Sequence, residues 1–183
     1  DTDRSRGLGD VYKRQLQGLA QGAQPIISYN YGAGNSNRVR RAYRLLLTCS
    51  VCYAMLFCLL IQLFPGVFAA IFTSNAELLA FTKPMLRIYT LALGLFGIQI
   101  ACQMTFTALG NAKASIIVAV LRKFILLLPL IYMMPHLYTA DLTKAVFMAE
   151  PVADVLAVAF TSVLFFFEFR KALRAMPKSE KNN

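Results

Sequence analysis

Four ionisable residues interrupt two long apolar segments of the sequence. Arg122 and Lys123 fall within one segment. Glu150 and Asp154, four residues apart on one face of a helix, fall within the next segment beside Pro151. Ionisable side chains inside a membrane are costly, and they typically pair with one another or mark a path for protons or ions. These residues are therefore the first candidates for chemistry.

Counting helical rise predicts that two of these residues meet. With a rise of about 1.5 Å per residue, Arg122 and Asp154 both lie about 18 Å from the outer edge of a hydrocarbon core about 30 Å thick. We expect an Arg122–Asp154 contact, with Glu150 about one turn nearer the outside and facing a cavity. Two interpretations are open. The pair is either a static contact that fixes helix packing, or a proton or cation relay in which Glu150 or Asp154 titrates as substrate passes.

Amide side chains form a second candidate group. One polar stripe follows helical spacing of four, seven and eleven positions and consists of Gln17, Gln21, Gln24 and Ser28. Gly18 and Gly22 form a G-x-x-x-G pair on an adjacent face, which predicts close helix packing. The spacing recurs downstream in Gln99, Gln103 and Thr107. Because a bare amide is costly in lipid, each stripe either bonds to a neighbouring helix or lines a water-filled cavity. Repetition on two helices favours a shared aqueous chamber.

The elements that carry these residues are apolar and long. The chain has 183 residues, of which 57% are hydrophobic and only 15% charged, with a mean hydropathy of +0.54. Segments 45–72, 88–109, 114–134 and 145–169 approach or exceed the roughly 20 residues needed to cross a membrane. Turn residues separate them, at Gly110-Asn111 and Pro135-His136 among others. Residues 15–31 resemble the tail of a fifth helix that stops at 32–35. The fold class predicted is all-α, a polytopic membrane helix bundle.

Basic residues predict the orientation of this bundle. The net charge is +10, but the basic residues lie in short clusters between apolar runs, so we expect no nucleic-acid partner. One side of the membrane would hold Arg38, Arg40, Arg41, Arg44, Lys113, Arg170, Lys171, Arg174, Lys178 and Lys181. The other would hold Lys83 and Lys144. By the positive-inside rule the C-terminus is cytoplasmic.

Soluble-enzyme chemistry is not indicated. The sequence contains no nucleophile triad, phosphate loop or metal-ligand cluster, so we expect no enzyme activity, no cofactor and no metal site. The four cysteines (Cys49, Cys52, Cys58 and Cys102) fall in apolar segments, and we interpret them as buried small apolar side chains. Residues 1–15 are polar and patternless up to the first apolar segment, and we expect them to be foreign or disordered.

Three stretches carry a resemblance to a known family. "QGAQPIISYNYGAGN", followed by "RVRRAYR" and an apolar helix, resembles the second-half signature of the multidrug and toxic compound extrusion (MATE) family, especially its MepA-like branch. "KPMLRIYTLALGLFGIQIACQMTFTALGNAKAS" and "VLRKFILLLPLIYMMP" are further matches. The likeness runs in order from residue 16 to residue 169.

The resemblance implies a fold and an activity. Family members have twelve helices in two six-helix lobes, with both termini cytoplasmic. On this mapping residues 16–170 form most of the C-terminal lobe, from the end of helix eight through helix twelve, and 171–183 form a cytoplasmic tail. The N-terminal lobe of the same chain would be the missing partner. The family expels organic cations and drugs by alternating access, driven by H+ or Na+ entry, through a cavity between the lobes.

One position departs from the family pattern. The sodium-coupled NorM-like branch has an acidic residue just before the G-I-Q match, where this chain has Phe96 followed by Gly97-Ile98-Gln99. One expected cation ligand is therefore absent. Coupling in this lobe would depend on other groups, such as Glu150 or Asp154, and would otherwise belong to the missing lobe.

The sequence thus predicts a C-terminal fragment of a cation-coupled multidrug efflux antiporter in a bacterial-style inner membrane. The candidate pathway residues are Gln21, Gln24, Ser28, Gln99, Gln103, Arg122, Glu150 and Asp154. One alternative is a lipid-linked oligosaccharide flippase of the wider superfamily, whose cavity would be more basic. Another is a membrane scaffold subunit, in which the polar stripes only join helices.

Overall fold

The protein is a bundle of helices. The computed structural model describes residues 7–70, 75–90, 92–137 and 142–176, and these residues contain helices and no strand. The described helices, in chain order, are α2 (Gly7–Gly32), α3 (Ser36–Leu63), α4 (Pro65–Ala70), α5 (Ala76–Thr90), α6 (Leu93–Ala108), α7 (Ala112–Val120), the π-helix η1 (Leu121–Leu127), α8 (Leu128–Leu137) and α9 (Leu142–Ala175).

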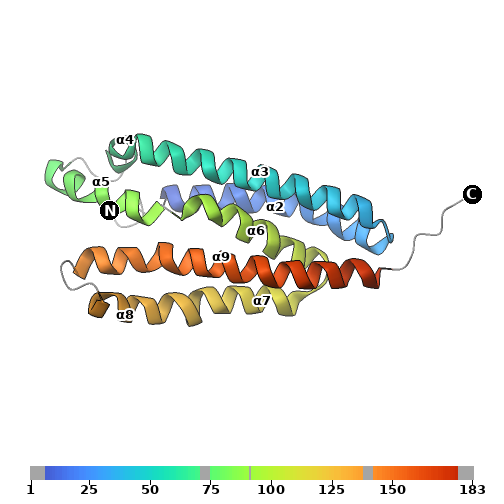
Figure 1. Ribbon diagram of the computed structural model, residues 1–183. Coiled ribbons are helices and arrows are strands. Elements are labelled where there is room, and N and C mark those ends of the chain that lie inside the picture. The colour runs from blue at the N-terminus through green and yellow to red at the C-terminus, as the bar shows by residue number, and fades with distance from the viewer. Residues whose placement is uncertain (1–6, 71–74, 91, 138–141, 177–183) are drawn as a thin grey trace, which may run out of the picture.

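The long helices run side by side (Figure 1). Helix α6 lies between the α2–α3 pair and α9, and it packs against all three. The α7–η1–α8 rod packs along the far side of α9. Within the described residues, three stretches are long and apolar enough to cross a membrane, namely Ser36–Leu63, Ala112–His136 and Met148–Ala175. A fourth crossing is possible if Glu77–Ile88 and Leu93–Ala108, bent by 49°, form one broken span. The predicted all-α membrane bundle is confirmed.

Two predicted spans differ from the helices found. The first was expected to reach residue 72, but α3 ends at Leu63 and the short α4 follows from Pro65. Proline has no backbone N–H, so Pro65 cannot donate the helical bond that would continue α3. The second was expected to begin at residue 88, but α6 begins at Leu93 after the bend that follows α5. This span is therefore broken rather than straight.

The turn after α6 lies where the sequence predicts it. Gly110 has a φ of 75°, a backbone conformation that side chains disfavour. Asn111 then caps α7, because its side-chain oxygen accepts a hydrogen bond from the N–H of Ala114 at 3.2 Å. The next break comes slightly later than predicted, since α8 continues through Pro135 to Leu137.

The N-terminal helix α2 is longer than expected. Residues 7–15 are helical rather than disordered, and Tyr12 is fully buried with its ring stacked 4.8 Å from that of Phe57. The Tyr12 hydroxyl donates a hydrogen bond to the Leu93 carbonyl at 3.2 Å. Residues 1–6 lie outside the described residues, and a foreign origin for 1–15 stays a prediction. At the other end, α9 includes residues 171–175 of the predicted tail, and 177–183 lie outside the described residues.

Helices α3 and α6 approach each other closely in the bundle core. A Cβ added to Gly97 would lie 2.5 Å from the Ser50 carbonyl oxygen, so only glycine fits there. Small residues that let backbones approach are typical of helix packing in membranes. The predicted close-packing pair behaves differently, because a Cβ on Gly18 or Gly22 would meet nothing within 4 Å. Neither glycine therefore marks a close approach to another described helix.

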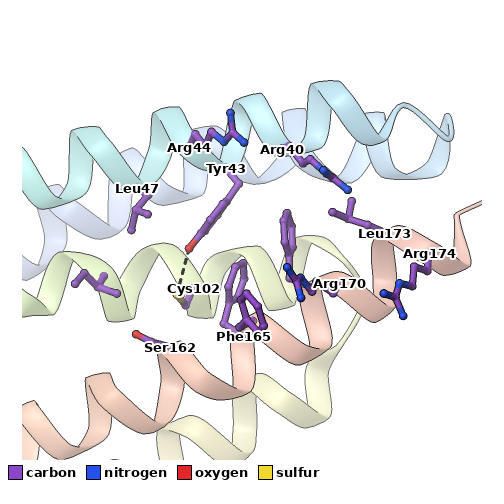
Figure 2. A pocket seen from close by; sticks show the side chains of 13 residues that line it. Arg40, Tyr43, Arg44, Leu47, Cys102, Ser162, Phe165, Arg170, Leu173 and Arg174 are labelled. Carbon is purple, nitrogen blue, oxygen red and sulfur yellow. Dashed lines mark hydrogen bonds between the residues drawn. The ribbon is translucent and has the colours of Figure 1, made fainter.

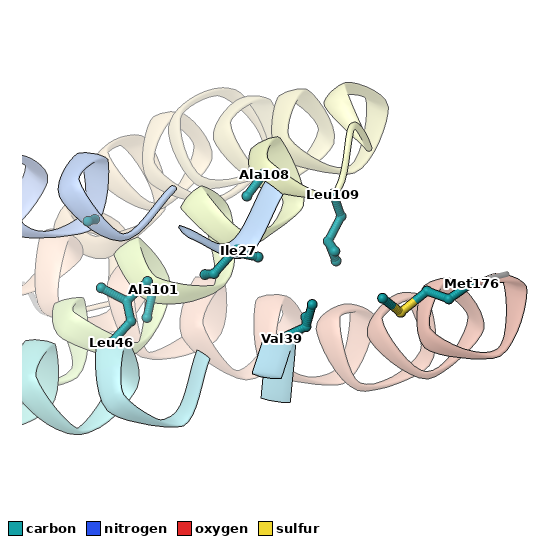
Figure 3. Close-up of a cluster of buried hydrophobic side chains, with 8 residues drawn as sticks. Ile27, Val39, Leu46, Ala101, Ala108, Leu109 and Met176 are labelled. Atoms are coloured by element: carbon teal, nitrogen blue, oxygen red, sulfur yellow. The ribbon is translucent and has the colours of Figure 1, made fainter. Parts of the chain in front are cut away.

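Apolar side chains from three helices and two residues that follow helices meet near one end of the bundle (Figure 3). They come from α2, α3 and α6 and from the positions just after α6 and α9, and they are Ala20, Ile27, Val39, Leu46, Ala101, Ala108, Leu109 and Met176. This cluster fixes the end of the bundle that carries the basic residues. The α2–α3 turn, the α6–α7 turn and the end of α9 all lie at that end, as the charge pattern predicts (Figure 1).

The cysteines are less buried than the sequence analysis expects. Cys102 is buried on α6 and Cys58 is half-buried, but Cys49 and Cys52 are exposed on α3. The expectation of burial is therefore wrong for Cys49 and Cys52, because they lie on the side of α3 that faces away from the bundle. All four are free thiols.

Candidate functional site

The candidate site begins with an irregular helix. Arg122 lies in η1, where the backbone follows π-helical geometry over Leu121–Leu127. The N–H of Leu128 bonds to the carbonyl of Lys123, five residues earlier. Pro129 follows directly and has no N–H to continue the α-helical pattern, which favours such a local widening. Single π-turns inside helices are frequent at functional sites.

Arg122 reaches across to two carboxylates on α9. Its Nε donates to Asp154 Oδ1 at 2.7 Å, a charge-assisted hydrogen bond. Its Nη2 lies 3.9 Å from Glu150 Oε1. The Arg122 and Asp154 side chains are only 16% and 13% exposed, and Glu150 is 28% exposed. The predicted Arg122–Asp154 contact is present, and Glu150 joins the same guanidinium.

A third helix completes the cluster. The Arg122 guanidinium lies 5.0 Å from the centroid of the Phe96 ring on α6, within the range of a cation–π contact. Phe96 is buried and occupies the position where the NorM-like resemblance would place an acid. Sequence reasoning marked Phe96 as a lost ligand but missed its contact with Arg122. Its position before Gly97-Ile98-Gln99 was the available signal.

One guanidinium thus faces two carboxylates in this cluster. Ionisable side chains inside a membrane are costly, and they typically pair with one another or mark a path for protons or ions. Within the described residues, no group of three or more His, Cys, Asp or Glu side chains is arranged to hold a metal ion.

The predicted glutamine stripe of α2 lies on its outer face. Residues that point into the bundle from α2 include Tyr12, Leu16, Ala20 and Ile27, all buried. Those of the stripe are largely on the other side, with Gln17, Gln21 and Ser28 exposed and Gln24 half-buried. This amide-bearing face therefore requires a cover or a wet cavity from outside the described residues.

The α6 amides lie on the inner part of the bundle. Gln99 is buried, and its Oε1 accepts no hydrogen bond from the described residues. Gln103 is half-buried. Both share a helical face with Phe96, because the three residues recur at intervals of three and four. The Thr107 hydroxyl, further along that face, lies 3.5 Å from Ser115 Oγ on α7.

The structure thus brings together one part of the predicted site and leaves another apart. Arg122, Glu150 and Asp154 form a cluster, and Gln99 and Gln103 share the helical face of the Phe96 ring that contacts it. The stripe of α2 is separate from this cluster, and none of its residues lines the cavities found among the described residues. A chamber common to both stripes stays a prediction.

Sequence reasoning missed another polar contact near the basic end. Asn111 donates from Nδ2 to Glu168 Oε2 at 2.9 Å, linking the α6–α7 turn to α9. Lys171 lies 4.0 Å from the other oxygen of Glu168. Tyr31 and Gly110 join these residues around a cavity of about 290 Å³. No pattern in the sequence pairs Asn111 with Glu168, because they are 57 positions apart.

Solved structures of MATE transporters are similar to this fold. One, described as the inward-facing conformation of a multidrug resistance MATE family transporter of the MOP superfamily, matches with a TM-score of 0.82 and 17% identity over 90% of this chain and 38% of that one. The outward-facing conformation of such a transporter matches with a TM-score of 0.79 and 18% identity over 87% of this chain and 36% of that one. The bent form of the Vibrio cholerae MATE transporter VcmN matches with a TM-score of 0.71 and 21% identity over 91% of this chain and 38% of that one.

These likenesses establish the fold, and the chain spans roughly two fifths of each of these transporters. A search of curated proteins finds no match. A family profile, that of MatE, matches residues 12–133, which is well over half of the sequence and includes Phe96 and Arg122. The chain therefore belongs to the MatE family.

Proposed function

We propose that this chain supplies the C-terminal lobe of a cation-coupled efflux transporter that expels organic cations and drugs by alternating access. The proposal rests on one observation above the others. A cluster of one guanidinium and two carboxylates, from Arg122, Glu150 and Asp154, lies inside a membrane bundle. Ionisable clusters at such positions are typical of proton and ion paths, which is what coupling requires.

The cluster is placed where helix movement would affect it. Its members come from η1 and α9, and Phe96 adds a contact from α6. The π-helical turn at Arg122 and the buried Pro151 beside Glu150 are both weak points in their helices. A shift of one helix against another would lengthen the Arg122–Asp154 contact and expose the carboxylates to ions. This supports a relay over a static pair.

The substrate class follows from the charge of the site. The sequence predicts two basic residues deep in the bundle, and one of them is Arg122. Its guanidinium contacts two carboxylates. A lipid-linked oligosaccharide flippase needs a strongly basic cavity to accept its anionic substrate, and this arrangement offers less positive charge than that. Lys123, the second deep basic residue, is exposed. We therefore favour small organic cations as substrates. The sequence resemblance separately supports the MepA-like branch.

The orientation follows from the charge asymmetry. The described basic residues of α3, α7 and α9 gather at one end of the bundle, and Lys83 belongs to α5 toward the other. By the positive-inside rule, we expect the basic end, including the end of α9, to lie on the cytoplasmic side of a bacterial-type inner membrane. A reporter that is active only in the cytoplasm, fused after α9 in the full-length protein, should be active. One that is active only outside the cytoplasm should be inactive at the same position.

Efflux measurements test the proposal directly. Cells expressing the full-length protein are loaded with a fluorescent organic cation, and efflux is followed with Na+ and pH varied independently. Glu150→Gln should weaken the dependence on the coupling ion while the protein still accumulates in the membrane. A scaffold subunit would show no efflux in either form, and a flippase would show none for the cationic dye.

A further inference from the structure

A crevice with a basic rim opens between α3, α6 and α9 (Figure 2). Its volume is about 680 Å³. Two arginines on α3 and two on α9 line its opposite walls, and they are Arg40, Arg44, Arg170 and Arg174. All four side chains are exposed, and they lie at the end of the bundle where the basic residues gather. None of these residues belongs to the ion-pair cluster.

The depth of the crevice is apolar. Phe165, Phe169 and Leu47 line it, and the Tyr43 ring stacks 4.6 Å from the Phe165 ring. The floor is closed where the Tyr43 hydroxyl meets the Cys102 sulfur at 3.6 Å (Figure 2). The crevice therefore has two chemically different parts, a cationic rim and an apolar interior.

Among the described residues, no acidic side chain lines the crevice to neutralise the arginines. Glu168, which is close in sequence on α9, instead contacts Asn111 and Lys171 beside the neighbouring cavity. The Arg170 guanidinium lies 4.0 Å from the centroid of the Phe166 ring, so its position is held by a cation–π contact. Arg170 and Arg174 also line a second cavity on the outer side of α9, so the basic rim continues around that helix.

We propose that this crevice binds an anionic glycerophospholipid, with its phosphate between the arginines of α3 and α9 and one acyl chain against the aromatic interior. Basic pockets between helices at the cytoplasmic side of a membrane are suited to anionic headgroups. Arginine forms paired hydrogen bonds to phosphate oxygens. A free phosphate ion would leave the apolar interior unused, and a zwitterionic lipid would leave the rim unbalanced. The site rests on the membrane location and on the proposed cytoplasmic orientation of the basic end, and it is independent of the proposed transport.

Native mass spectrometry of the purified full-length protein tests the site. The probes are phosphatidylglycerol and phosphatidylcholine with identical acyl chains, each titrated with the wild type and with Arg40→Gln/Arg170→Gln. The double variant should lose affinity for phosphatidylglycerol by about thirty-fold, from the contribution of each basic residue near an anionic headgroup. The matched control Arg38→Gln/Arg41→Gln removes two charges from α3 outside the crevice and should keep most of the affinity. If the control loses as much as the test variant, the site is not this crevice.

Two further arms separate the possible sources of the phosphate. Inorganic phosphate should not displace phosphatidylglycerol, and Ser162→Phe, which fills the interior, should weaken lipid binding with all four arginines intact. Displacement by inorganic phosphate, an unchanged affinity in Ser162→Phe, or equal binding of phosphatidylcholine would each overturn the proposal. If Arg40→Gln/Arg170→Gln does not give folded protein, Arg44→Gln/Arg174→Gln removes the remaining two arginines, one from each wall, and gives the same comparison.

Discussion

Replacing Asp154 by asparagine removes the negative charge that lies 2.7 Å from the Arg122 guanidinium. Breaking a fully buried ion pair by removing one partner costs about 3–5 kcal/mol of folding stability. Here the cost is reduced, because Glu150 stays within 3.9 Å of the same guanidinium and asparagine can still accept a hydrogen bond. We expect a loss of about 2 kcal/mol in stability for Asp154→Asn. Glu150→Gln, at the longer distance and greater exposure, should lose about 0.5–1 kcal/mol.

The functional effect should exceed the structural one. Asp154→Asn removes the carboxylate closest to Arg122, which on the proposed relay is a group that takes up the coupling cation. The full-length variant should therefore reach the membrane at a moderately reduced level and lose ion-driven efflux of an organic cation dye. Glu168→Gln makes the same chemical change on the same helix, outside the cluster, and should keep efflux.

The assay separates packing from coupling. Folded yield is measured by detergent-solubilised, monodisperse protein, and efflux is measured per folded molecule with Na+ and pH varied. The charge swap Arg122→Asp/Asp154→Arg should recover yield, because an ion pair is again present, but it should not recover efflux. If yield and efflux recover together in the swap, the pair is only a packing contact. Efflux by Asp154→Asn with unchanged ion dependence would also refute the reasoning.

Four further variants test the packing of the bundle. Gly97→Ala should lower folded yield, because its Cβ would lie 2.5 Å from the Ser50 carbonyl oxygen. Gly22→Ala has open space around its Cβ and should give wild-type yield. Equal yields would contradict the close approach of α3 and α6. Asn111→Ala should lower thermal stability in detergent by about 0.5–2 kcal/mol, since it loses the helix cap and the bond to α9. Tyr12→Phe should cost about 1 kcal/mol in the same thermal assay, and an unchanged stability would show that the start of α2 does not dock as described.

Some features of this protein follow from the sequence alone. Apolar length predicts membrane helices, because each must satisfy its backbone hydrogen bonds within the hydrocarbon core. The turn at Gly110 and Asn111 follows from local backbone chemistry. The contact between Arg122 and Asp154 was also predictable, since helical rise gives both residues the same depth and an unpaired charge there is costly.

The neighbours of each helical face needed the tertiary structure. Helical spacing shows that Gln21 shares a face with the rest of its stripe, but not that this face is outside while Gln99 is buried. The Phe96 ring under the Arg122 guanidinium depends on how α6 and η1 are rotated toward each other. Rotation and pairing of helices are set by packing between segments distant in sequence, such as Gly97 against α3, and a periodicity within one segment carries no information about them.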